Sequence, residues 1–91
     1  MILKSFSEYV HANYEKNALV LLNEWIISRL NRASLDKTDH VLQTELYYAE
    51  NNNKKTFIAA KSETGRTLMQ ALYNFALSVE NHKRAKHNHR R

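Results

Sequence analysis

A chain of 91 residues with no cysteine, no proline and one glycine is a single domain without a disulfide framework, a thiolate nucleophile or a cysteine-ligated zinc site. Tight-turned β architectures depend on glycine and proline, so the scarcity of both favours a few long helices. The net charge of +5 is unevenly placed, because residues 1–81 hold nine basic and nine acidic side chains while residues 82–91 hold five cations and no acid. We therefore divide the chain into a neutral helical body, 1–81, and a basic tail, 82–91, that is rich in His, Lys and Arg.

The first predicted helix spans residues 6–32. Ser5 and Glu8 have the spacing of a capping box at its start, and hydrophobic residues recur at intervals of three, four and seven. Residues 15–17 are its weakest part, and a break there would split it in two.

The hydrophobic centre of the chain lies inside this helix, at residues 18–30. Its apolar side chains cover roughly 260° of the helix circumference, so it must be covered on several sides, by its own chain or by a second copy. We predict a homodimer or partner interface that includes Leu19, Val20, Trp25 and Ile27. The stretch is short of the ~20 residues that cross a bilayer and contains two charges, so we expect no membrane segment. The N-terminus lacks the pattern of a secretory signal, and we expect a cytoplasmic protein.

A second helix is predicted over residues 35–50. Ser34 is a plausible N-cap, and Asp36 and Asp39 follow in the first turns, where negative charge is favourable. The three asparagines at 51–53 end this helix, because asparagine tolerates the left-handed conformation of a helix C-terminus.

From residue 54 two interpretations remain open. An apolar stripe favours one long third helix over 54–86, although Gly65 would cost it about 1 kcal/mol relative to alanine. The alternative is a β-hairpin at 44–60, followed by a helix from about Ser62. The preferred fold class is therefore an all-α bundle of three helices, in which residues 62–65 are the place where the third helix would break. The alternative is an α+β fold with that hairpin.

The basic tail predicts a polyphosphate ligand. Its cations, Lys83, Arg84, Lys86, Arg90 and Arg91, have a density suited to a nucleic-acid backbone, although they would also suit a helix C-terminus or an acidic protein surface. A helix-turn-helix around residues 59–65 has its alanine and glycine off by one position. If the following helix read DNA, Arg66, Thr67 and Gln70 would be its exposed contacts.

No pattern predicts catalysis, a metal or a cofactor. The chain has no Gly-rich phosphate loop and no catalytic triad set, and a single Glu8-x-x-His11 lacks the second copy that a di-iron site needs. Two non-enzymatic functions remain: a nucleic-acid-associated protein that binds through its tail, and a protein-binding regulator, such as a phage- or plasmid-type inhibitor or an immunity protein, that docks a helical face on a larger partner.

Overall fold

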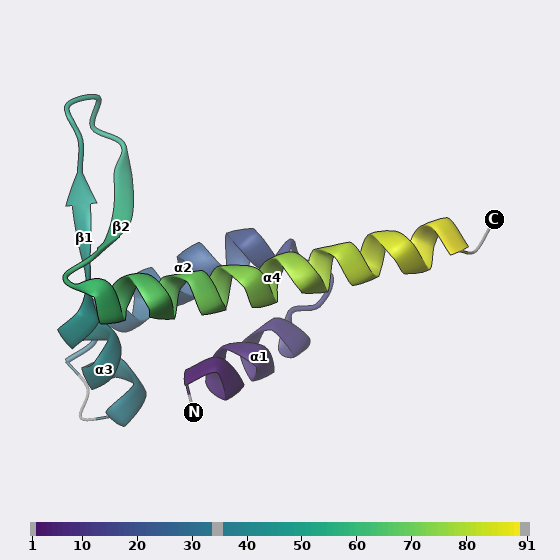
Figure 1. The fold of residues 1–91 in the computed structure, drawn as a ribbon, viewed down its shortest axis with the longest axis horizontal. Coiled ribbons are helices and arrows are strands. Elements are labelled where there is room, and N and C mark those ends of the chain that lie inside the picture. The colour runs from purple at the N-terminus through teal and green to yellow at the C-terminus, as the bar shows by residue number, and fades with distance from the viewer. Residues whose placement is uncertain (1, 34–35, 90–91) are drawn as a thin grey trace.

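The computed structural model describes residues 2–33 and 36–89, with the side chains of residues 2–33 and 36–86. In chain order its elements are α1 (Ile2–Ala12), α2 (Ala18–Leu30), α3 (Lys37–Glu45), β1 (Leu46–Glu50), β2 (Thr56–Ala60) and α4 (Glu63–His89). Helix α4 runs the length of the molecule, and α1 and α2 pack along it (Figure 1). The hairpin projects at the end where α4 begins, and the last turns of α4 project at the opposite end.

The all-α prediction of three helices over 6–32, 35–50 and 54–86 is wrong. The described residues form four helices and a two-stranded antiparallel hairpin, so the fold is α+β and the alternative with a hairpin at 44–60 fits it better. The hairpin forms because its residues make contacts with distant parts of the sequence, which local periodicity does not reveal. At the base of the hairpin, for example, the Lys61 amide donates a hydrogen bond to the Glu45 carbonyl at 2.8 Å.

The predicted first helix is two helices, α1 and α2. The break falls at residues 13–17, where Asn17 is the N-cap of α2: its Oδ1 accepts hydrogen bonds from the amides of Leu19 and Val20 at 2.8 and 3.3 Å. Helix α1 begins at Ile2, so Ser5 lies inside it and the predicted capping box at Ser5 is wrong. Asparagine is a favoured N-cap residue, so Asn17 starts a new helix within the stretch that the periodicity predicted to be one helix.

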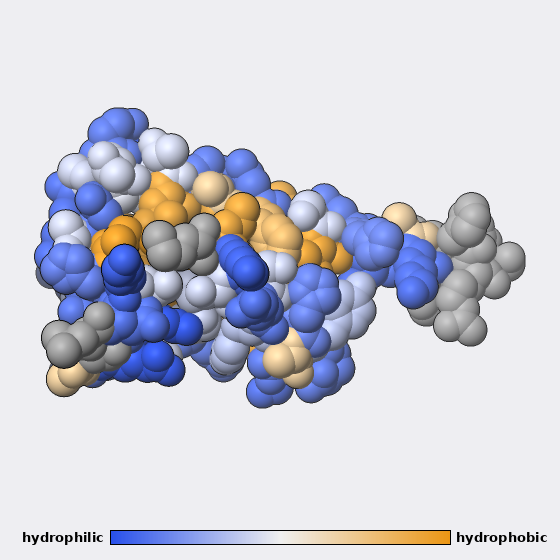
Figure 2. Space-filling view, turned by 90° about the horizontal axis from the view of Figure 1, so that it is seen from below, coloured by the Kyte–Doolittle hydropathy of each residue, from blue (hydrophilic) through white to orange (hydrophobic). Residues whose placement is uncertain are grey.

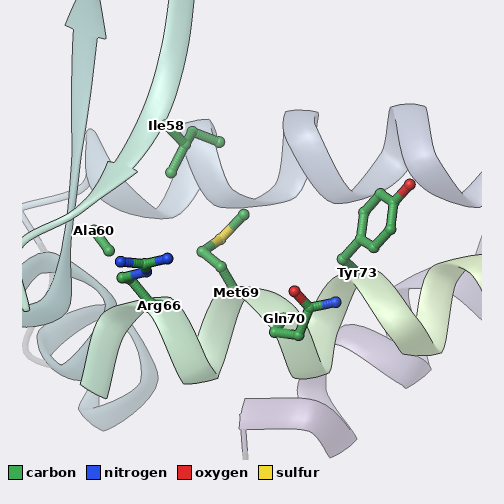
Figure 3. Close-up of a pocket in the computed structure, with 6 residues that line it drawn as sticks. All are labelled: Ile58, Ala60, Arg66, Met69, Gln70 and Tyr73. Atoms are coloured by element: carbon green, nitrogen blue, oxygen red, sulfur yellow. The ribbon is translucent and has the colours of Figure 1, made fainter. Parts of the chain in front are cut away.

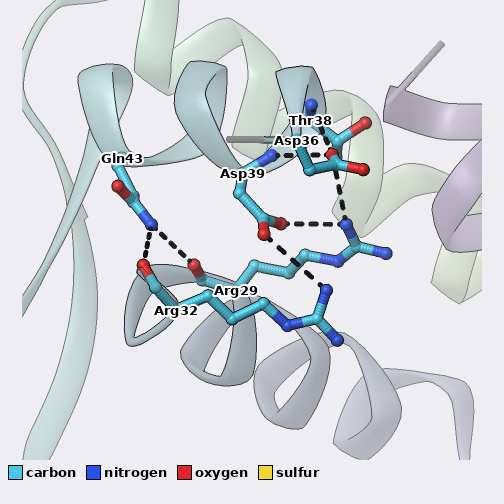
Figure 4. A network of polar contacts seen from close by, with 6 residues as sticks. All are labelled: Arg29, Arg32, Asp36, Thr38, Asp39 and Gln43. Atoms are coloured by element: carbon cyan, nitrogen blue, oxygen red, sulfur yellow. Dashed lines mark hydrogen bonds and ion pairs between the residues drawn. The ribbon is translucent and has the colours of Figure 1, made fainter. Parts of the chain in front are cut away.

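Helix α3 is shorter than the predicted 35–50 and is joined to α2 by a polar network (Figure 4). The predicted N-cap Ser34 lies outside the described residues, and Asp36 caps the helix instead. The buried Asp39 carboxylate lies 2.9 Å from Arg29 and 3.6 Å from Arg32. Gln43 Nε2 donates to the carbonyls of both arginines, at 3.0 and 2.8 Å, and so satisfies the C-terminal end of α2.

The hairpin has a fixed register, from Leu46 opposite Ala60 to Glu50 opposite Thr56. Asn51 organises the turn, because its Oδ1 accepts from the amides of Asn53 and Lys55 at 2.9 and 3.1 Å. Lys54 has a φ of 62°, in the left-handed region. The asparagines predicted to end a helix therefore form a hairpin turn.

One hydrophobic core joins all six elements. Phe6 packs between two aromatic rings, with centroid distances of 5.2 Å to Trp25 and 5.8 Å to Phe75. The largest fully buried apolar side chains come from every helix and from the base of the hairpin: Phe6, Val10, Leu21, Ile26, Leu42, Leu46 and Leu72.

The single glycine, Gly65, sits where α4 meets the base of the hairpin. A Cβ at this position would collide with the Glu45 carbonyl oxygen and lie 3.1 Å from the Ala60 Cβ. Glycine in the first turn of α4 is thus required by close packing, which offsets its low helix propensity.

Candidate nucleic-acid interface

Lys83, the first cation of the tail, is bound within the protein. Its Nζ donates to Glu80 Oε2 at 2.8 Å and to the Lys16 carbonyl at 2.9 Å, and lies 4.5 Å from the centre of the Tyr14 ring. The Lys83 side chain is 21% exposed. Its ammonium therefore ties α4 to the α1–α2 turn, and it is a poor candidate for a phosphate contact.

Glu80 completes this junction. Its Oε2 also accepts a hydrogen bond from the Ala18 amide at 2.8 Å, at the start of α2. The hydrogen bond from Lys83 lowers the pKa of the Glu80 carboxyl; burial opposes this shift, and the Ala18 amide and the charges of Lys83 and Arg84 add to it. A carboxylate at a helix N-terminus is favourable because the orphan amides there carry partial positive charge.

Arg84 and Lys86 are the tail cations that face solvent in the structure. Both side chains are exposed, and neither forms a hydrogen bond or ion pair with another residue in the described part of the chain. Both belong to the last turns of α4, which project past α1 and α2 (Figure 1). Figure 2 shows that the hydrophobic band on the body stops before this hydrophilic end. The predicted contacts Arg90 and Arg91 lie outside the described residues.

Arg66, the sixth predicted contact, is not on a helix-turn-helix. A strand, β2, precedes α4, so the unit at 59–65 is strand-turn-helix and that hypothesis is wrong. Arg66 instead lines a shallow hollow of about 340 Å³ between β2 and α4 (Figure 3). The other lining residues are Ile58, Ala60, Met69, Gln70 and Tyr73.

The hollow contains a residue that sequence reasoning missed, Tyr73, and Gln70, which was considered only as a helix-turn-helix contact. Tyr73 is 45% exposed, and Gln70 Nε2 donates to Asn74 Oδ1 at 2.9 Å. Arg66, Met69, Gln70 and Tyr73 have spacings of three, four and seven, which place all four on one side of a helix. This spacing on α4 is the sequence feature that could have predicted one wall of the hollow. The other wall is β2, and the preferred all-α prediction contained no strand there.

The residues of the predicted dimer interface are divided by the fold. Val20 is 53% exposed and Leu19 and Ile27 are half-buried, but Trp25 is only 3% exposed. The Trp25 ring packs against the Phe6 ring at an interplanar angle of 47°, and the Arg29 guanidinium lies 5.1 Å from the Trp25 ring centre. Within one copy Trp25 therefore belongs to the core. Leu19 also borders a second hollow of about 290 Å³, which Phe57 and Tyr73 help to line.

Among the described residues, no three His, Asp or Glu side chains come together as metal ligands would. Within the same residues, no helix is both long and apolar enough to cross a membrane. No known protein family, curated protein or solved structure matches this chain.

Proposed function

We propose that this chain is a small non-enzymatic protein that associates with nucleic acid, holding phosphates through the C-terminal end of α4. The observation that carries the proposal is the exposure of Arg84 and Lys86 on helical turns that project past the neutral body, in a segment with no acidic residue. Cations in such a position attract a polyphosphate backbone without sequence preference. The proposal places the protein in the cytoplasm.

The test compares Arg84→Gln and Lys86→Gln with a control, Lys4→Gln, which removes one exposed cation from α1. Binding of a fluorescently labelled duplex is followed by anisotropy at several salt concentrations. Each tail variant should flatten the slope of log K against log salt by about 0.9, the value for one phosphate contact on B-DNA. The Lys4→Gln slope should match the wild type. Equal slopes for all four proteins would overturn the proposal.

A second candidate function is a protein-binding regulator, and the exposed outer side of α2 favours it. Val20 is an apolar side chain that is 53% exposed on α2, and Ile27, two turns further along, is half-buried. This side of α2 would bind a larger protein or a second copy of the chain. Recovery of one stoichiometric protein partner after nuclease treatment would favour this function over the first.

A further inference from the structure

The outward side of α4 carries a straight stripe of four residues, Arg66, Tyr73, Leu77 and Arg84. Their separations of seven, four and seven residues place them within about 40° of one another around the helix axis. Every member is exposed: Tyr73 by 45%, Leu77 by 36%, and both arginines in the same class. The stripe is therefore exposed to solvent along most of the length of α4.

The two ends of the stripe are arginines that form no ion pair with a residue that the structure describes. The Arg66 guanidinium makes no hydrogen bond or ion pair with the residues that the structure describes. Arg84 contributes to the lowered pKa of Glu80 only through its charge, without an ion pair. At 1.5 Å per residue, eighteen residues of helix separate them by about 27 Å. A polyanion that lay along α4 could contact both arginines.

The hollow between β2 and α4, which begins at Arg66 and extends along α4 to Tyr73, offers a surface on which a planar ring could stack. The Tyr73 ring stands on α4 at one end of the hollow, with the amide of Gln70 beside it and Ile58 of β2 facing α4 from across it (Figure 3). Gln70 Nε2 donates to Asn74, and the Gln70 Oε1 atom accepts no hydrogen bond from a described residue. An aromatic wall with a free amide acceptor and an arginine matches an unpaired nucleobase, whose face stacks and whose edge offers hydrogen-bond donors.

We infer that the stripe on α4 is a track for single-stranded nucleic acid, with one unpaired base stacked on Tyr73 and flanking phosphates held by Arg66 and Arg84. The inference rests on the proposed function and deepens it, because it names the strand state of the ligand and adds a base contact that the tail cannot supply. Charge complementarity selects this occupant: a purely apolar partner would leave both arginines unused.

The experiment measures anisotropy of labelled twelve-nucleotide strands with the full chain. The probes are oligothymidylate, oligouridylate and an abasic strand with the same backbone. Tyr73→Leu keeps a hydrophobic side chain and removes the aromatic face. Tyr47→Leu is its matched control, because Tyr47 is 46% exposed, is on β1 opposite Ala59 and does not line the hollow.

Loss of one stacked base should weaken binding about 5- to 150-fold. We expect this loss for Tyr73→Leu on the base-containing strands and no change on the abasic strand, with Tyr47→Leu like the wild type on all three. Arg66→Gln should weaken all three strands alike, since it contacts phosphate. The oligothymidylate and oligouridylate arms show whether DNA or RNA is preferred.

Equal binding by Tyr73→Leu and wild type, or equal weakening on the abasic strand, would overturn the inference. The proposed function would survive either result if Arg84→Gln still flattened the salt slope. Failure of the wild type to bind any strand or duplex would instead overturn the proposed function itself.

Discussion

Glu80 on α4 accepts a hydrogen bond from the backbone amide of Ala18 at 2.8 Å, across 62 positions of sequence. The same carboxylate oxygen binds Lys83, which reaches the Lys16 carbonyl. One acidic side chain thus accepts from the first amide of α2, beside the cap that Asn17 provides, fixes α4 to the α1–α2 turn and neutralises the first cation of the tail.

Glu80→Gln should reduce stability at pH 7 by about 1 kcal/mol, because a charged acceptor of two hydrogen bonds is replaced by a neutral one. The native pKa of Glu80 is lowered, so the unfolded chain binds its proton more tightly than the native chain does. The stabilisation is therefore complete above the unfolded value of about 4.3 and is lost as the pH falls through the lower native pKa. Urea unfolding of both proteins at pH 7 and at pH 2.5 measures this. A stability gap of the same size at both values would refute the role given to the charge.

Gly65→Ala should destabilise the protein by about 1–3 kcal/mol, because the added methyl group forces α4 away from the Glu45 carbonyl and Ala60. Helix propensity alone gives the opposite sign, a gain of about 1 kcal/mol. Thermal or urea unfolding decides between them. The control is Thr67→Ala, at an exposed position two residues further along α4, which should gain a few tenths of a kcal/mol. A stabilised Gly65→Ala protein would mean that the hairpin and α4 do not meet as described.

Lys54→Gly should stabilise the hairpin by about 1 kcal/mol, since glycine adopts a φ of 62° without the cost that a side chain imposes. Lys55→Gly is the matched control: it removes the same charge from the neighbouring position, which has no positive φ, and should be neutral or destabilising. Amide hydrogen exchange in β1 and β2 reports the change locally. Slower exchange in the Lys55→Gly protein than in Lys54→Gly would contradict the turn geometry.

Val20→Asp tests the predicted homodimer. If the outer side of α2 pairs two copies, a charge at a side chain 53% exposed in one copy should separate them without unfolding either. Sedimentation equilibrium should give twice 10.7 kDa for the wild type and 10.7 kDa for the variant. Leu3→Asp, at a position 43% exposed on α1, should leave the dimer intact. A wild-type monomer at high micromolar concentration would remove the dimer from the account.

The sequence was sufficient where local signals and the structure coincide. Residues 18–30 form a central helix because apolar side chains cover most of its circumference and must be buried. Residues 67–82 are helical under both interpretations of the sequence. It was insufficient at residues 46–60, because the periodicity there fits a helix as well as a strand. The choice depends on the contact of Gly65 with Glu45 and on the Lys61 amide, neither of which is a local property.

The candidate site shows the same division. The charge asymmetry of the tail is visible in the sequence, and the helical spacing of Glu80 and Lys83 predicts that they can pair. The second bond of Lys83, to the Lys16 carbonyl, depends on a turn 67 residues away. The burial of Trp25 within one copy depends on Phe6 of α1, a helix that the sequence analysis did not separate from α2.

The salt dependence of binding tests the central claim most directly. Wild-type protein is titrated with labelled oligothymidylate from low to high salt, and log K is plotted against log salt. Contacts from Arg66, Arg84 and Lys86 predict a slope of about −2 on a single strand, at roughly −0.7 per phosphate, and a steeper one if Arg90 and Arg91 also bind. A slope near zero, or no binding at low salt, would contradict the claim that these exposed cations hold a polyphosphate.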